Sequence, residues 1–277
     1  MSQVENQLGP EGQPAEIPFQ QDRPFGEPAK LGPAGRLMGT LMSPGETFLD
    51  INRKPTIIVP IIITMITGIG LALFLNWQAK PDWKQIARTV IVRQSEKLGT
   101  KPTPEQLQQQ IDISAKFYPF LPALYALFSP IAYPIAAGAL ALGMLLLQAK
   151  TTFKRVLSVF AWVGCSVGLV NAIVAAASLM VRDAQSLKPQ DYFYPLGIAP
   201  TNLSFLLADD ASQVLRALFS SIDVFTIWKI LLLIVGLAAI AGTRKITTAK
   251  TGTLVIGLWL LILMIGLGFA ALGFGAQ

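Results

Sequence analysis

The chain has 277 residues, of which 52% are hydrophobic and only 14% charged, and its mean hydropathy is +0.53. Soluble domains carry about a quarter charged residues, so this composition excludes an ordinary soluble protein and predicts one whose main solvent is lipid. The absence of histidine excludes a Ser–His–Asp triad and a histidine-ligated metal, and the net charge of +6 falls on tails and loops, which favours membrane topology signals over nucleic-acid binding.

The N-terminal part of the chain divides in two. Residues 1–35 are rich in Pro, Gly, Gln and Glu, which predicts a disordered tail, and they lack the apolar core of a signal peptide. The first membrane segment must therefore direct insertion, and residues 36–277 form the membrane domain. Residues 36–55 predict short amphipathic turns on the membrane surface, with these apolar residues on one side: Leu37, Leu41, Phe48 and Ile51.

Five long apolar segments follow. Each meets the requirement of roughly 20 apolar residues for a helix that crosses a bilayer, and their continuous character favours helices over a barrel. The second contains four prolines and is too long for one straight span, so it predicts a bend before a span near 129–148. The sequence thus predicts an all-α polytopic membrane protein, a bundle of five transmembrane helices. The segments are 56–77, 117–148, 156–181, 224–242 and 254–274.

Charge in the loops predicts how the chain is oriented. The short loops 149–155 and 243–253 are densely basic, which is typical of cytoplasmic loops. With five spans, the N-terminus then lies in the cytoplasm and the C-terminus outside the cell membrane. The long loop 78–116, which this topology places outside, also carries many Lys and Arg residues. The numbers of basic residues inside and outside are therefore nearly equal. The prediction rests on the higher density of positive charge in the short loops.

The two long loops contain amphipathic helices of their own. Thr103 and Gln106 have the spacing of a capping box that starts one helix, and Trp83, with the apolar residues after it, predicts another. In the second long loop, Asp210 is placed to cap a helix, with Gln213 three residues later. These helices either lie along the membrane surface or cover the ends of the spans.

Few residues are candidates for chemistry, and we expect no catalytic residue, cofactor or metal. Asp209 and Asp210 could suggest a cation site, but helix capping explains them without further assumption. Cys165 lies in an apolar run and is interpreted as a small core residue. Asn171 stands in mid-span, where it either lines a solute path or hydrogen-bonds to a neighbouring helix.

Lys229 is the charge that stands inside an apolar segment. It follows Asp223, a natural helix cap, by six residues, which is roughly 9 Å along a helix. Because side chains lean toward the helix N-terminus, Lys229 could snorkel to water, with Trp228 holding depth at the interface. The alternative is a functional charge inside the bundle.

Small residues at helix-packing spacing are plentiful. They allow close approach of helices, within one bundle or in a homo- or hetero-oligomer. The pairs are Gly164 and Gly168, Gly266 and Ala270, and Ala137 and Ala141.

The pattern Asp223-x-Phe225-x-x-Trp228, followed by leucines and Gly236, resembles the D-x-F-x-x-W…G pattern of the Yip1 domain family. The segment before the first span and Thr152-Phe153-Lys154 before the third are also similar to the family, so the resemblance covers about 36–274. It implies five transmembrane helices and a cytoplasmic N-terminus. The soluble loops and Pro-rich tail look more like the bacterial members, so Rab-type partners are not carried over, and an inner-membrane location is expected.

Two functions follow as hypotheses. The first is a non-enzymatic integral membrane protein that organises the bilayer or a partner protein, whose identity the sequence does not indicate. The alternative is a small-solute or lipid transporter, for which Pro130 and Pro134 in the second segment are the best argument, although no convincing internal repeat is present. An intramembrane enzyme without histidine would need a Ser–Lys or carboxylate pair, and none is evident from the sequence.

Overall fold

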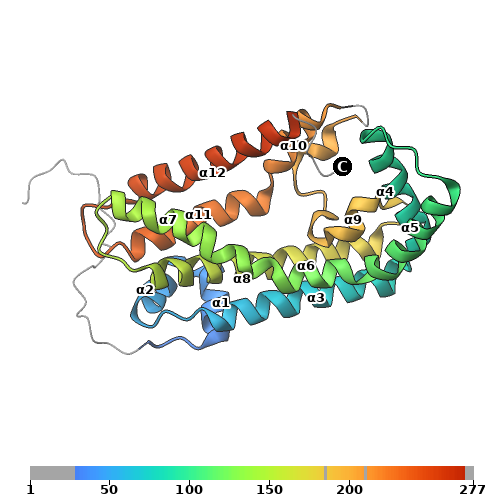
Figure 1. Ribbon diagram of the computed structural model, residues 1–277. Helices are drawn as coiled ribbons and strands as arrows, with labels where there is room; N and C mark the ends of the chain where they lie inside the picture. Colours follow the sequence, from blue (N-terminus) through green and yellow to red (C-terminus); the bar gives the residue numbers. More distant parts are fainter. Residues whose placement is uncertain (1–28, 184–185, 209–210, 272–277) are drawn as a thin grey trace, which may run out of the picture.

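The computed structural model describes residues 29–183, 186–208 and 211–271 (Figure 1). Within these ranges the regular secondary structure is helical, apart from one isolated antiparallel bridge between Asn202 and Asp223. The prediction of an all-α protein is confirmed.

Helices of very different length make up the fold. The main ones, in chain order, are α1 (Pro33–Met42), α2 (Pro44–Arg53), α3 (Ile58–Ala79), α4 (Trp83–Lys97), α5 (Pro104–Phe117), α6 (Leu121–Phe128), α7 (Ala132–Leu146), α8 (Phe153–Val181), α9 (Pro189–Phe193), α10 (Gln213–Ser221), α11 (Val224–Ala239) and α12 (Thr248–Ala271), with short 3-10 turns between some of them, including η1 (Tyr118–Phe120) and η2 (Ser129–Ile131).

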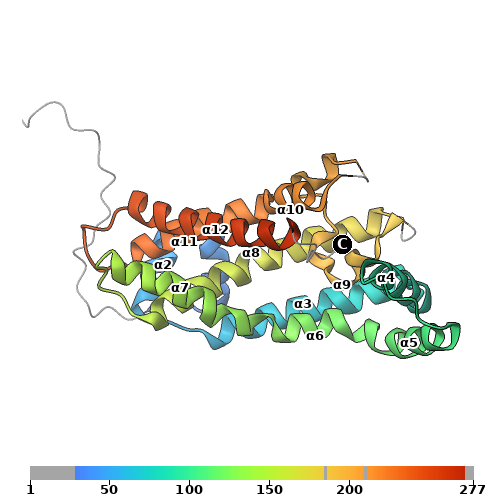
Figure 2. The ribbon, with the colours of Figure 1, turned by 45° about the horizontal axis from the view of Figure 1, so that its top comes forward.

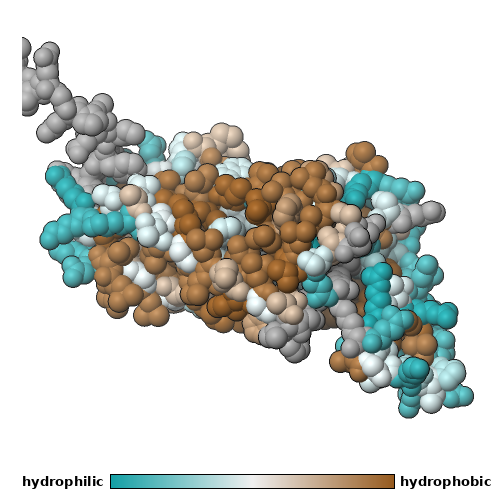
Figure 3. Space-filling model, turned by 90° about the horizontal axis from the view of Figure 1, so that it is seen from above, coloured by the Kyte–Doolittle hydropathy of each residue, from teal (hydrophilic) through white to brown (hydrophobic). Residues whose placement is uncertain are grey.

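The long helices run side by side between two polar ends. Figure 3 shows an apolar surface across the middle of the molecule with hydrophilic residues gathered at both ends. Four helical stretches are long and apolar enough to cross a bilayer: α3, the continuous run from α5 to α7, α8 and α12. The chain is therefore a multi-pass membrane protein. The end that holds α1, α2 and the short turns is called the α1–α2 end, and the opposite one the α4–α5 end (Figure 1).

The fourth apolar segment forms a shorter helix than the sequence predicts. α11 has 16 residues, or about 24 Å, against a hydrocarbon core of about 30 Å. Neighbouring segments satisfy the backbone at its two ends. Val224 N donates to Thr201 O at 3.1 Å, and just beyond the other end Lys150 N donates to Ala241 O at 2.8 Å. With its ends bonded to protein, a short helix fits inside the bundle.

The second apolar segment bends, as its prolines predict. Helical structure continues for 43 residues from Pro104 to Leu146, but η1 and η2 interrupt it at Pro119 and Pro130. α6 packs on α3, whereas α7 packs on α8 and α12. The bend thus divides one long segment between two parts of the bundle (Figures 1 and 2).

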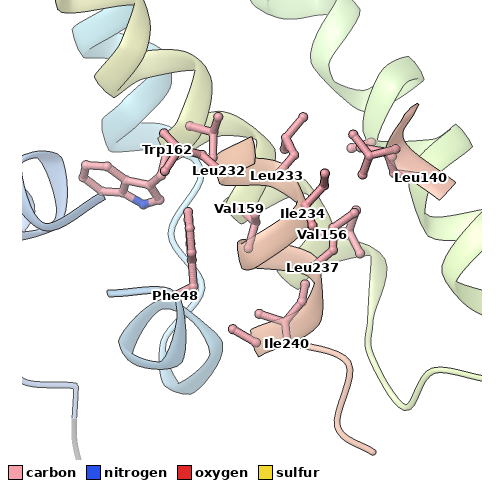
Figure 4. Packing of buried hydrophobic residues seen from close by; sticks show 14 of the residues in the cluster. Phe48, Leu140, Val156, Val159, Trp162, Leu232, Leu233, Ile234, Leu237 and Ile240 are labelled. Carbon is pink, nitrogen blue, oxygen red and sulfur yellow. The ribbon is translucent and has the colours of Figure 1, made fainter. Parts of the chain in front are cut away.

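α8 is the centre of the bundle. It contacts α1, α3, α7 and α11, and half of its most apolar window is buried, against 11% for α12. Figure 4 shows the main core cluster, with Trp162 of α8 beside Leu232 of α11 and with Phe48 reaching up from α2. The core is therefore concentrated toward the α1–α2 end.

The loop helices cover the end of the bundle. α4 and α5 pack on each other through a small core of Ala87, Ile91 and Ile111. The capping box predicted at Thr103 is confirmed, because its hydroxyl accepts from Gln106 N at 3.3 Å and its own N–H donates to Gln106 Oε1 at 3.0 Å.

The start of α10 differs from the prediction. Ser212, whose hydroxyl accepts from Leu215 N at 3.2 Å, is the N-cap of this helix. Asp210 was expected in that role, and it lies with Asp209 outside the described residues. α10 packs against α12.

Residues 36–55 do not form turns on the membrane surface. They form α1 and α2, which pack on α8 and α11, and Phe48 and Ile51 are fully buried there. The expectation was wrong because an amphipathic pattern does not distinguish a lipid surface from a protein surface. α1 also begins at Pro33, inside the predicted tail 1–35, whereas residues 1–28 lie outside the described residues.

Two truncations test where the folded domain begins. Lys30 N and Leu31 N donate to Asp50 Oδ1 at 2.6 and 3.4 Å. Removing residues 1–28 should leave the thermal unfolding temperature in detergent unchanged, because that segment has little apolar surface to bury. Removing residues 1–35 should lower stability by about 1.5–3 kcal/mol, the usual value of a hydrogen bond to a charged group. Equal unfolding temperatures for the two truncations would contradict this boundary.

Candidate functional site

A buried ion pair joins α1 to α2. Arg36 and Asp50 are 3% and 4% exposed. The Nε and Nη2 atoms of Arg36 donate to Asp50 Oδ2 at 3.0 and 2.8 Å, a two-bond contact that fixes the relative position of the two groups. Because an unpaired charge at this depth is costly, each residue requires the other.

The ion pair extends into a network that reaches α8. Arg36 Nη1 donates to Lys54 O at 2.9 Å and to Thr56 Oγ1 at 2.8 Å. The same Thr56 hydroxyl accepts from the indole of Trp162 at 3.1 Å. Thr56 N donates to Ser158 Oγ at 3.0 Å, and this hydroxyl donates back to Thr56 O at 2.8 Å. The five residues Arg36, Asp50, Thr56, Ser158 and Trp162 are called the Arg36 network.

The Arg36 network holds helices in place. Its polar groups point at one another, and Trp162, Ser158 and Arg36 are almost completely buried. The guanidinium of Arg36 takes part in hydrogen bonds through all three of its nitrogens. Within the described residues no three side chains of metal-binding type come together. The network therefore acts as a clamp between α1, α2 and α8.

Gly236 marks the closest meeting of α11 with its neighbours. A Cβ atom added there would lie 2.5 Å from Val159 Cγ1 and 3.3 Å from the ring of Phe48. Real side chains do not approach so closely, so the contact between α2, α8 and α11 requires glycine at this position. Figure 4 shows Phe48 and Val159 converging on this stretch of α11.

Asp223 caps α11 and ties a loop to it. Its Oδ1 accepts from Phe225 N at 2.9 Å and from Thr226 N at 3.0 Å, and its Oδ2 accepts from the hydroxyl of Thr201. Phe225 is buried in the core, and Trp228 packs partly against it. Asp223 thus fixes both the start of α11 and the chain segment beside it.

Lys229 lies on the inward side of its helix. It precedes Gly236 by seven residues, and residues seven apart share a face of a helix. The side chain is half-buried and makes no hydrogen bond or ion pair among the residues that the structure describes. That Lys229 snorkels toward the Asp223 end of α11 stays a prediction. Its aliphatic chain would have to run along the side of α11 that packs against the bundle.

Asn171 differs from the expected pattern of helix-to-helix bonding. The residue is only 9% exposed, and its Oδ1 atom has no hydrogen-bond partner in the described part of the chain. The hydrogen bond to a neighbouring helix is therefore not formed at this atom. Ser166 Oγ on the same helix is also buried without a hydrogen-bond partner among the described residues.

The small residues contribute unequally to packing. A Cβ at Gly164 would lie 3.0 Å from the Tyr133 hydroxyl, and Ala137 is fully buried, so both serve contacts within the chain. Gly168 and Gly266 have no such neighbour within 4 Å. Oligomer formation through them stays a prediction.

The sequence-based search missed the Arg36 network. One signal was available: Trp162 stands in the middle of an apolar segment, and a buried indole N–H needs an acceptor. The identity of that acceptor, more than 100 residues earlier at Thr56, depends on tertiary structure.

Comparison with known proteins gives one match. The family model described as Yip1 domain matches residues 38–270, a range that includes Asp50, Trp162, Asp223 and Gly236. No curated protein and no solved structure matches the chain.

Breaking the ion pair from either side should be strongly destabilising. Arg36→Met or Asp50→Leu leaves the partner charge buried and unpaired, at a cost of about 3–5 kcal/mol. The double variant should cost less than the sum of the two. Thermal unfolding of the purified protein in detergent measures all three.

The matched control is the exposed pair Lys84–Asp112, whose nitrogen and oxygen lie 3.2 Å apart. Lys84→Met should leave the unfolding temperature almost unchanged, because solvent screens an exposed pair. Similar losses for Arg36→Met and Lys84→Met would show that burial does not decide the strength of the first pair.

Three variants separate the roles of residues on α11. Asp223→Ala removes the helix cap and should cost about 0.5–2 kcal/mol. Trp228→Ala should also lower the unfolding temperature, because it removes packing against the core. Lys229→Met breaks no bond to the described residues and should leave the unfolding temperature unchanged or raise it. If Lys229→Met is the most damaging of the three, Lys229 has a partner or role of its own.

Proposed function

The chain belongs to the Yip1 domain family, and on this premise we propose that it is a non-enzymatic integral membrane protein that organises a partner protein or the membrane around it. The Arg36 network supports this proposal most directly. The buried polar groups of this network bond to one another and so hold α1, α2 and α8 together. As a result, α1 and α2 are a fixed part of the bundle.

The helices α1 and α2 together, called the α1–α2 platform, offer a surface for such a partner. Met38 and Met42 are 52% and 76% exposed on α1. Methionine adapts to irregular partner surfaces, and exposed apolar side chains on a rigid element suit protein contacts. A platform fixed by buried charges can present these side chains in one orientation.

We further propose that the α1–α2 platform faces the cytoplasm of a bacterial cell, with the C-terminus on the other side of the inner membrane. Basic residues in the two short turns at the α1–α2 end, and in the first turns of α8 and α12 that follow them, support this orientation. They are Lys150, Lys154, Arg155, Arg244, Lys245 and Lys250.

Transport of a lipid or a small solute is the second candidate. One observation favours it: an apolar hollow of about 170 Å³ lies between α3, α6 and α8 and reaches Cys165 and Gly168. A transported molecule would need this hollow to open to both sides of the membrane.

Photo-crosslinking in intact cells distinguishes the two. A photoreactive amino acid at Met42 should give a discrete protein adduct, which should disappear when Arg36→Met releases the platform. The same probe at Met264, a 66% exposed side chain on α12, is the control and should give no protein adduct. Absence of an adduct at Met42, together with solute or lipid movement in proteoliposomes, would favour the transporter.

A further inference from the structure

A second feature of the molecule lies far from the α1–α2 platform. It is an apolar groove of about 920 Å³ near the α4–α5 end, where α6 and the start of α7 face α4 and α9. Most of its wall is aliphatic or aromatic, and the lining includes Val90, Leu124, Phe128, Ala132, Ile135 and Phe193.

The groove covers the depth of one leaflet. Its inner limit, Ile135, lies 11 residues before the end of α7 at Leu146, or about 16 Å along the helix, which is near the middle of a bilayer. Its outer limit is formed by Val90 of α4 and Pro189 of α9, which belong to the helices that cover the bundle. An occupant must therefore be long and apolar and must begin near the headgroup region.

A polar pocket of about 490 Å³ lies beside the outer limit of this groove. It is formed by the start of α4 and the end of α5, and its charged lining residues are Asp82, Lys84, Asp112 and Lys116. Lys84 is paired with Asp112 at 3.2 Å. Lys116 is exposed and interacts electrostatically with Asp112. It makes no ion pair among the described residues, so its ammonium group can also reach a ligand in the pocket.

Aromatic rings connect the groove to the pocket. Phe193 and Tyr118 line the groove with ring centroids 5.0 Å apart, and Trp83, which lines the polar pocket, lies 6.4 Å from Phe193. Trp83 and Val90 share one face of α4, because they are seven residues apart. Aromatic side chains prefer the level where hydrocarbon meets headgroups.

We propose that groove and pocket together bind one phospholipid, with an acyl chain in the groove and the phosphate at Lys116. The order of surfaces matches the order of chemistry along such a molecule: apolar chain, interfacial region, anion. A helix from a second copy would fill the apolar groove but would bring no negative charge to Lys116. The site is independent of the proposed function, since both a membrane organiser and a transporter could hold a lipid here.

The test uses the full chain purified in detergent, with dioleoyl phosphatidylglycerol as probe. Rising lipid concentration should raise the unfolding temperature of the parent protein and give an apparent affinity. Lys116→Ala should weaken that affinity about fivefold, the usual effect of one cation near an anionic headgroup. Ala132→Trp fills the groove and should abolish the response.

Two controls match these variants. Lys101→Ala removes an exposed charge from the α4–α5 loop, and Met264→Trp adds an indole to the lipid-facing side of α12. Both should respond to the lipid like the parent. Lys116 is exposed, so Lys116→Ala is expected to fold. If Ala132→Trp fails to fold, the response of Lys116→Ala alone decides whether the proposal holds.

Several results would overturn the proposal. Equal responses of the parent and Lys116→Ala would show that the lipid acts as bulk solvent. An equal response to dioleoylglycerol, which lacks phosphate, would show that Lys116 does not bind the headgroup. An equal response to inorganic phosphate alone would show that the groove does not bind an acyl chain. A dimer in the parent that Ala132→Trp converts to a monomer would assign the groove to a second copy.

Discussion

A polar group buried away from water must find its partner within the protein, and the packed half of this molecule is arranged around that constraint. The guanidinium of Arg36 and the carboxylate of Asp50 satisfy each other, and the donors left over reach Lys54 O and Thr56 Oγ1. Thr56 in turn satisfies the indole of Trp162. Removing Arg36, Asp50 or Thr56 leaves a buried polar group without its partner, so the helices that carry these residues are held in one arrangement.

The same constraint explains why α11 can be short. Its first N–H groups are taken by the Asp223 carboxylate and Thr201 O, and the segment beyond its last turn bonds to Lys150. The close contact at Gly236 then brings α11 against α8 and α2. Length is thus less important for this helix than the satisfaction of its two ends.

Features that depend on local sequence could be predicted. The apolar segments, the proline bend near Pro130 and the capping box at Thr103 each follow from residues close together in the chain. The position of α1 and α2 could not, because their apolar side fits lipid as well as it fits α8. The Arg36 network could not be predicted either, since its members come from three helices and from the segment between α2 and α3. The groove beside α6 exists only where the bent run and α9 come together.

The distance along the chain between Thr56 and its partners has a consequence for biogenesis. Ser158 is 102 residues from Thr56, and at about 5–20 residues per second a ribosome needs roughly 5–20 s to synthesise that interval. The interval between Phe48 and Gly236, which pack together, is longer still. The first helices therefore leave the ribosome well before their docking partners exist, and the N-terminal segment must stay unassembled, open to proteases and to the insertion machinery, until the third and fourth apolar segments arrive.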